Sequence, residues 1–274
     1  MHSFPLASWR TRARVVVYPL LVALPTALAG QAAADSSSDD RRSRFTATIA
    51  VVQMAQHVPS ISPSRYRGTG VGATLRWERV DSSSLAEVST EFVNTSLRSS
   101  SSVESGHVNR VFVGTLALTR ARSIGRMSSP RRAAFVGLRL DGTAHADVQQ
   151  YGPLRPGTDV FGYALFTASP VLRADFASKR RRLVWELSVP LIGLADIPYA
   201  NAKAEGRLRL HAVTVTQLRT VRQHLRYHTG VTKGWGVVWG YDFLLEQQAR
   251  YDTRTYARQA ISVALNAPMG RRRP

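Results

Sequence analysis

Apolar and polar residues alternate with a period of two along most of the chain after residue 43. A period of two is typical of a β-strand, because successive side chains of a strand point to opposite sides. In the clearest case every second residue from Trp235 to Leu245 is large and apolar, and the residues between them include Gly236, Gly240 and Asp242. No stretch keeps a helical spacing of apolar residues for long, so the pattern predicts an all-β domain.

About ten segments carry this alternation and are rich in Val, Thr, Leu, Phe, Tyr and Trp. Many of them run to about 14–18 residues, whereas strands of soluble sheets usually have about five or six. Pro170 and Pro190 each remove a ladder hydrogen bond and predict a bulge or a bend in their segments. The predicted segments lie near 44–58, 68–81, 84–98, 109–123, 132–147, 159–176, 181–194, 206–221, 231–247 and 255–268.

The connections between the segments alternate in length. The longer ones are 57–67, 98–109, 148–158 and 195–206, and the shorter ones are 80–84, 123–131 and 177–181. Long loops at one end and short turns at the other are typical of outer-membrane barrels, whose sheet must close to satisfy its edges in lipid. We therefore predict an antiparallel transmembrane β-barrel of about ten strands, within a range of about eight to twelve. The alternation alone fits a soluble β-sandwich equally well.

Residues 44–268 resemble bacterial outer-membrane β-barrel proteins in pattern, without a motif of a specific family. The resemblance implies export by the general secretion route and insertion by the barrel-assembly machinery. Such proteins usually end in a strand with a terminal aromatic residue. Here the last segment, TYARQAISVALNAP, alternates correctly but is followed by MGRRRP, so the chain departs from that pattern.

The N-terminus has the organisation of a secretory signal peptide over residues 1–34. Three arginines precede an apolar run over 15–28, which is shorter than the roughly 20 residues of a transmembrane helix. Small residues follow, and cleavage fits after Ala29 or Ala34. Residues 35–43 form a polar lead-in that we expect to be disordered, 44–268 the barrel domain, and 269–274 a basic tail.

The chain is strongly basic, with 37 Lys and Arg against 18 Asp and Glu and a formal net charge of +19. The basic residues are spread along the chain, and export would separate it from nucleic acid. We therefore expect outer-membrane lipid and lipopolysaccharide as partners, and no nucleic acid. The chain has no Cys, which excludes thiolate metal sites and Cys nucleophiles. We expect no cofactor and no metal.

Charged and aromatic residues separate onto the two faces of the predicted strands. On the polar face, charged side chains must pair because an unpaired buried charge is costly. His145 lies between Asp141 and Asp147 on one face and could serve as a general base. The lumen-lining candidates are Arg76, Glu78, Glu87, Glu91, Arg139, Asp141, His145, Glu186, Arg209 and Asp242. The lipid-facing aromatic candidates are Trp77, Trp185, Trp235, Trp239, Tyr241 and Phe243.

Around ten strands leave little open lumen, since wide aqueous pores need roughly 16–18. We therefore expect a non-enzymatic barrel in the outer membrane of a Gram-negative-type bacterium, with a narrow or side-chain-plugged polar lumen. Its role would be structural, binding or the passage of a small solute. Two alternatives stay open. One is an outer-membrane hydrolase acting on lipid through His145 or His228, and the other is a soluble periplasmic β-sandwich that binds a ligand.

Overall fold

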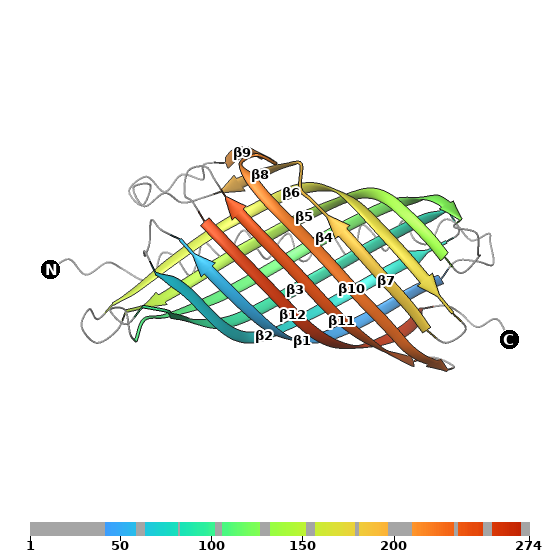
Figure 1. Cartoon of the computed structure of the whole chain (residues 1–274), viewed down its shortest axis with the longest axis horizontal. Coiled ribbons are helices and arrows are strands. Elements are labelled where there is room, and N and C mark those ends of the chain that lie inside the picture. Colours follow the sequence, from blue (N-terminus) through green and yellow to red (C-terminus); the bar gives the residue numbers. More distant parts are fainter. Residues whose placement is uncertain are drawn as a thin grey trace. The chain divides into compact units, whose positions relative to one another are not determined.

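The computed structural model describes residues 42–58, 64–81, 83–101, 106–126, 132–151, 157–178, 181–196, 210–232, 235–248 and 254–269. The described chain is a single sheet of strands (Figure 1). No helix among these residues is long and apolar enough to cross a membrane. The strands are β1 (Arg42–His57), β2 (Arg65–Val80), β3 (Ser84–Ser99), β4 (Val108–Arg126), β5 (Arg132–Gln150), β6 (Thr158–Ala177), β7 (Arg181–Ser188), β8 (Ile192–Asp196), β9 (Leu210–Thr214), β10 (Leu218–Thr232), β11 (Trp235–Gln248) and β12 (Arg254–Met269).

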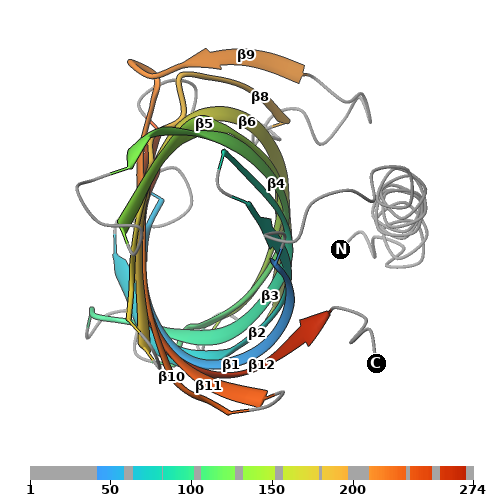
Figure 2. The same ribbon diagram turned by 90° about the vertical axis from the view of Figure 1, so that its right-hand side faces the viewer.

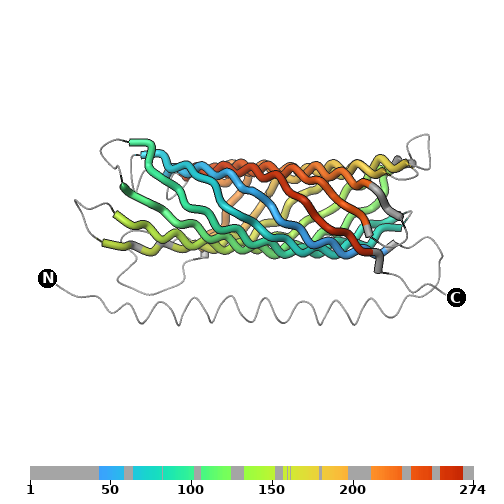
Figure 3. Tube along the Cα trace, turned by 90° about the horizontal axis from the view of Figure 1, so that it is seen from below, coloured from blue at the N-terminus to red at the C-terminus, as the bar shows by residue number. Residues whose placement is uncertain are grey.

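The sheet closes on itself as an antiparallel barrel (Figure 2). Pairing runs in chain order from β1 to β7, passes from β7 to β10, and continues through β11 to β12. β12 then pairs with β1 from Ser43↔Met269 to His57↔Thr255, and the two strands cross the barrel side by side in Figure 3. The ring therefore has ten strand positions, as predicted, and closure excludes the sandwich alternative.

Two of the ten positions hold an interrupted strand. β8 continues β7 along β6, after a break at 189–191 that contains Pro190. β9 and β10 are separated in the same way at 215–217, and β9 pairs with β8. The first break confirms the bend predicted at Pro190, since proline cannot donate to the ladder. Pro170, by contrast, lies within β6, with its partner Leu138 in regular register.

The predicted segment 206–221 was wrong at its C-terminal end. β10 continues to Thr232, so residues 222–230 belong to a strand and not to a connection. The stretch carries Arg222, His224, Arg226 and His228 on its inward side. Polar Gln223 and Thr229 stand among its outward residues, so the run of apolar outward positions that marks the other segments is broken here.

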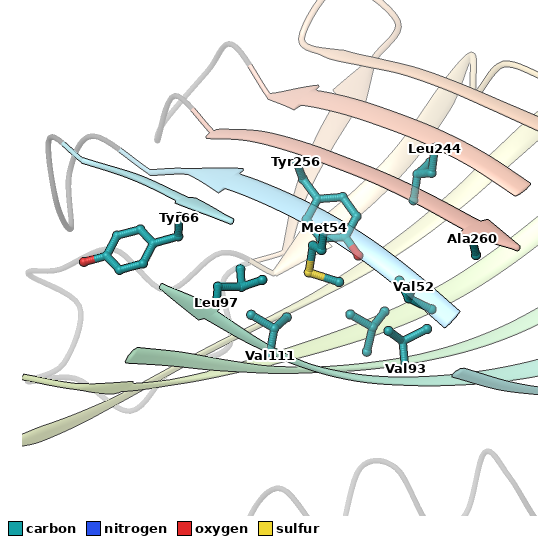
Figure 4. Packing of buried hydrophobic residues seen from close by; sticks show 10 residues of the cluster. Val52, Met54, Tyr66, Val93, Leu97, Val111, Leu244, Tyr256 and Ala260 are labelled. Carbon is teal, nitrogen blue, oxygen red and sulfur yellow. The ribbon is translucent and has the colours of Figure 1, made fainter. Parts of the chain in front are cut away.

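The two ends of the barrel are distinguished by the chain termini. We call the end where β1 begins and β12 finishes the terminal end, and the opposite end, where β1 finishes at His57 and β2 begins at Arg65, the loop end. In the loop half, the interior is partly apolar. Figure 4 shows side chains from β1, β3, β4, β11 and β12 gathered inside the barrel, with Tyr66 of β2 at one side of the group. This cluster comprises Val52, Met54, Tyr66, Val93, Leu97, Val111, Val113, Leu244, Tyr256 and Ala260.

At the terminal end, Asp81 organises the tight connection between β2 and β3. Its Oδ1 accepts hydrogen bonds from the backbone N–H groups of Ser83 and Ser84 at 2.8 and 2.6 Å, and the Ser84 hydroxyl donates to Oδ2 at 2.7 Å. Partial burial acts to raise the pKa of Asp81, but these hydrogen bonds outweigh it and hold the pKa below its usual value. The Asp81 side chain thus stabilises the turn by binding the backbone that follows it, as Asp side chains commonly do.

The inner face of β2 needs glycine where β3 approaches closely. A Cβ atom at Gly70 would lie 2.1 Å from the Asn94 carbonyl oxygen, and one at Gly68 would lie 2.0 Å from the Ser96 carbonyl oxygen. A Cβ atom added at Gly114 on β4 would lie in open space. Glycine therefore permits the close approach of β2 to β3, as it does at bends in barrels.

We predict that Gly70→Ala destabilises the barrel by about 2 kcal/mol or more, because the backbone of β3 must move to accept the methyl group. Gly114→Ala, the matched control, should change the free energy of unfolding by less than about 0.5 kcal/mol. Urea-induced unfolding in lipid vesicles, followed by Trp fluorescence, measures both. Equal effects of the two substitutions would contradict the close approach seen at Gly70.

Closure of the ring makes a second prediction. The folded protein in detergent should migrate faster on a gel when unboiled than when boiled, because a closed ladder of backbone hydrogen bonds resists mild detergent. Identical mobility before and after boiling, in a preparation with full β-sheet circular dichroism, would argue against a closed barrel.

Candidate functional site

Carboxylates are sorted almost completely to the inside of the barrel. Of the acidic side chains that the structure describes on strands, only Asp196 of β8 shares a side with the exposed apolar residues Ile192 and Leu194. The others alternate with outward residues and lie in the interior, most of them buried. The inward set is Glu78, Glu87, Glu91, Asp141, Asp147, Asp175, Glu186, Asp242 and Glu246.

Arg173 on β6 is the centre of an ionic network in the terminal half, and its side chain is completely buried. Its guanidinium contacts Glu78 of β2 at 2.5 Å and Glu87 of β3 at 3.2 Å. A third carboxylate, Asp175 on its own strand, lies 2.9 Å from Nε. Since β2 lies four positions from β6 in the ring, the contact with Glu78 crosses the lumen.

Further arginines extend this network around the interior. Arg226 of β10 contacts Glu87 and Glu186 at 3.5 and 3.4 Å, and Arg76 of β2 contacts Glu87 at 3.1 Å. The remaining links are Arg139 with Asp141 and Glu186, Arg182 with Glu78 and Asp175, and Arg222 with Asp141. We call these residues, together with Arg173, the terminal layer. Each carboxylate has at least one arginine, as burial of charge requires.

A second set of cross-lumen contacts lies in the loop half, and we call it the loop layer. Asp147 of β5 accepts hydrogen bonds from Gln56 of β1 at 2.8 Å and from Arg254 of β12 at 3.4 Å. The Gln149 amide donates to the Tyr66 hydroxyl at 2.9 Å. The other members are Asn109, which donates to Gln56, and Tyr163, which donates to Glu246 and lies under the Arg254 guanidinium at 4.1 Å.

A small polar cavity of about 20 Å³ lies beside the terminal layer, since Arg76 and Arg139 of that layer line it. A cavity of this size holds about one water molecule. His224 of β10 reaches it and pairs with Asp242 of β11, its direct cross-strand neighbour. The lining residues are Thr74, Arg76, Ser89, Glu91, Thr115, Arg139, His224 and Asp242.

The structure places every predicted lumen residue that it describes on the inward side. Arg76, Glu78, Glu87, Arg139, Asp141 and Glu186 meet in the terminal layer, and Glu91 and Asp242 line the cavity. Arg209 lies outside the described residues. His145 is set apart from the carboxylates that the sequence places beside it, because it stacks on Tyr163 at 4.2 Å between ring centroids. Asp141 pairs instead with arginines, and Asp147 with Gln56 and Arg254.

Several of the most connected residues were not among the sequence candidates. Arg173 and Arg182 alternate with outward residues on β6 and β7, but nothing local indicates that they reach β2. A signal does exist on β10. Its inward positions read Arg222, His224, Arg226 and His228, a period-two run of cations that predicts a charged inner face. The other missed members are Asp147, Asp175, Glu246, Arg254 and Arg258.

The outer face of the barrel is an apolar belt. Ile49, Val71 and Ile261 are 74%, 61% and 67% exposed, which is unusual for large aliphatic side chains in a folded protein. Among the predicted lipid-facing aromatics, Trp239 and Tyr241 are exposed on this face. Trp77, Trp185 and Phe243 occupy outward register positions and are partly covered, and the side chain of Trp235 lies outside the described part.

On β4, arginines bound this belt at both ends. On β4 the outward residues Arg110 and Arg120 enclose Phe112, Leu116 and Leu118. The ten residue steps between the arginines span about 33 Å along the strand, and a tilt of about 40° reduces this to a height of about 25 Å. This is the height of the apolar band of an outer-membrane barrel.

No protein-family model matches the chain, and no curated protein matches it in sequence. Among solved structures, the outer membrane protease OmpT from Escherichia coli is 8% identical, with a TM-score of 0.48 over 86% of this chain and 99% of that one. The translocator domain of the autotransporter NalP from Neisseria meningitidis is 8% identical, with a TM-score of 0.35 over 89% and 93%. An outer membrane channel from Pseudomonas putida F1 is 10% identical, with a TM-score of 0.36 over 85% and 97%.

These three structures are bacterial outer-membrane β-barrel proteins. The similarity assigns no activity to this chain, and its barrel fold is shown by its own strand pairing.

The terminal layer makes a direct prediction about stability. Arg173→Met should lower the free energy of unfolding by about 3–5 kcal/mol, because it leaves buried carboxylates without their central partner. Arg120→Gln on the outer face should change it by less than about 0.5 kcal/mol. The measurement is urea unfolding of both variants in lipid vesicles. A loss of less than about 1 kcal/mol for Arg173→Met would mean that the other arginines can replace it.

Proposed function

We propose that this protein is an outer-membrane β-barrel of a Gram-negative-type bacterium whose lumen is closed by its own side chains. Its role is then structural or binding, and it acts at its outer surfaces rather than by passing solutes. The observation that carries this proposal is the direct contact between opposite walls in both layers, Arg173 with Glu78 and Gln56 with Asp147.

The membrane location is supported by the barrel surface. Exposed aliphatic residues form a belt that is about 25 Å high where Arg110 and Arg120 bound it on β4, and such a surface is stable in lipid and prone to aggregation in water. The leader predicted over 1–34 supports export, and insertion would fall to the barrel-assembly machinery.

The geometry does not favour the hydrolase alternative. An enzyme acting on membrane lipid needs its catalytic histidine where the scissile bond can reach it. His145 and His228 are each only 6% exposed and both face the interior. His145 is enclosed further by Tyr163 and by Tyr256, whose ring centroid lies 5.2 Å away.

Planar-bilayer recording tests the closed lumen. The wild-type protein should show no steady single-channel current, since both layers obstruct the path and about ten strands leave little free lumen. A variant with Arg173, Arg226 and Arg254 all changed to Ala removes guanidinium groups from both layers and should show transient currents. Heat-modifiable gel mobility of the same preparations verifies that each has folded. A steady large conductance of the folded wild type would contradict the proposal.

A further inference from the structure

Four exposed arginines gather on the outer face of the barrel at the loop end. Arg65 and Arg67 follow each other on that face of β2, Arg98 lies on β3 and Arg110 on β4. Arg67 and Arg98 are direct cross-strand partners, and Arg110, which faces Ser96, is the diagonal neighbour of Arg98. Direct partners have Cβ atoms about 4.5–5.5 Å apart and diagonal ones about 7–8 Å. We call these four residues the loop-end arginine patch.

No carboxylate of the described residues balances this patch. The outward faces of β1 to β5 carry no Asp or Glu in the part of the chain that the structure describes. Within that part, none of the four guanidinium groups forms an ion pair, whereas the inward arginines are paired throughout the terminal layer. Like charges directly opposite each other destabilise a sheet. An arrangement of this kind indicates that an anion from outside the chain supplies the missing charge.

The surroundings of the patch define what kind of anion fits. Toward the middle of the same outward faces, Phe112 follows Arg110 directly on β4, Val71 lies two outward positions from Arg67 on β2, and Phe92 lies three outward positions from Arg98 on β3. Val71 and Phe92 are 61% and 53% exposed. A ligand seated here would place a phosphate on the guanidinium forks and an apolar chain against this belt. Arginine binds phosphate oxygens through two parallel hydrogen bonds, so neighbouring forks suit a ligand with more than one phosphate.

The position of the patch along the barrel axis indicates which membrane leaflet it would contact. The start of β1 and the end of β12 both lie at the opposite end of the barrel, and this end faces the periplasm in outer-membrane barrels. The patch would then lie in the outer leaflet, where lipopolysaccharide is found. We propose, on the basis of the membrane location proposed above, that the loop-end arginine patch binds the phosphates of lipid A, the bis-phosphorylated and multiply acylated lipid of lipopolysaccharide.

The terminal end offers a matched control. Arg120 and Arg122 are likewise exposed, outward and free of carboxylate neighbours on β4, but they would face the periplasmic leaflet. They are neighbours along one strand and not direct partners across two strands, so the paired arrangement of Arg67 and Arg98 is absent among them.

The test titrates bis-phosphorylated lipid A into the full-length exported protein in detergent micelles and measures bound lipid by native mass spectrometry. Changing Arg67 and Arg98 together to Gln should weaken binding at least tenfold. Changing Arg120 and Arg122 together to Gln should alter it less than twofold. Dephosphorylated lipid A should bind the wild type at least tenfold more weakly, and millimolar inorganic phosphate should not displace the lipid.

Equal affinity of both double variants would overturn the proposal, and so would equal binding of phosphatidylglycerol, which would make the patch a general anionic-lipid surface. Heat-modifiable mobility shows separately whether each variant forms the barrel, so loss of the lipid site and failure of the proposed membrane fold give different results. If Arg67→Gln with Arg98→Gln does not fold, the pair Arg67→Lys with Arg98→Lys keeps the charge but loses the fork. Binding by this Lys variant should fall about threefold or more, and wild-type affinity would contradict recognition by paired guanidinium groups.

Discussion

The contact between buried arginines and carboxylates across the lumen is the interaction on which the rest of this structure depends. An apolar outer surface obliges the sheet to close, because open edges have no hydrogen-bond partner in lipid. Closure of the sheet then places every second side chain inside the barrel, where the space is small. The carboxylates placed there have to be compensated, and Arg173 does this for Glu78, Glu87 and Asp175 at once. The same contacts that make the charges tolerable also obstruct the lumen.

The two halves of the interior solve the packing problem differently. In the terminal half, guanidinium groups bridge the walls, while the loop half combines the Gln56–Asp147 hydrogen bond with an apolar cluster around Met54 and Leu97. A cavity of about 20 Å³ remains beside the terminal layer, with room for about one water molecule. Because side chains fill the interior, we expect binding at the outer surfaces. There the loop-end arginine patch has no counterions from the described part of the chain.

Much of the architecture could be predicted from the sequence, because a period of two is a local signal. Ten strand positions, the alternation of long and short connections and the outward Trp239 and Tyr241 follow from it. The bend near Pro190 also follows, since its cause lies in one residue. β12 closes the ring against β1 although no aromatic residue ends it, so the missing terminal aromatic does not prevent closure.

The side-chain pairs across the lumen could not be predicted. They depend on the register between strands and on the curvature of the sheet, and the sequence of a single segment determines neither. Arg173 meets Glu78 only after the intervening strands have paired, and His145 stacks on Tyr163 rather than beside Asp141 for the same reason. The prediction of a connection over 222–230 was wrong because polar Gln223 and Thr229 interrupt the outward apolar pattern, whereas Arg222 and Arg226 lie on the inward face.

A double-mutant cycle on Glu78 and Arg173 tests the central claim most directly. The cycle compares Glu78→Leu, Arg173→Met and the double variant by urea unfolding in lipid vesicles. If the contact across the lumen supports the barrel, the double variant should be more stable than the sum of the single effects predicts, by about 2 kcal/mol or more. Additive effects, within about 0.5 kcal/mol, would contradict the claim and would show that the two walls are held independently of each other.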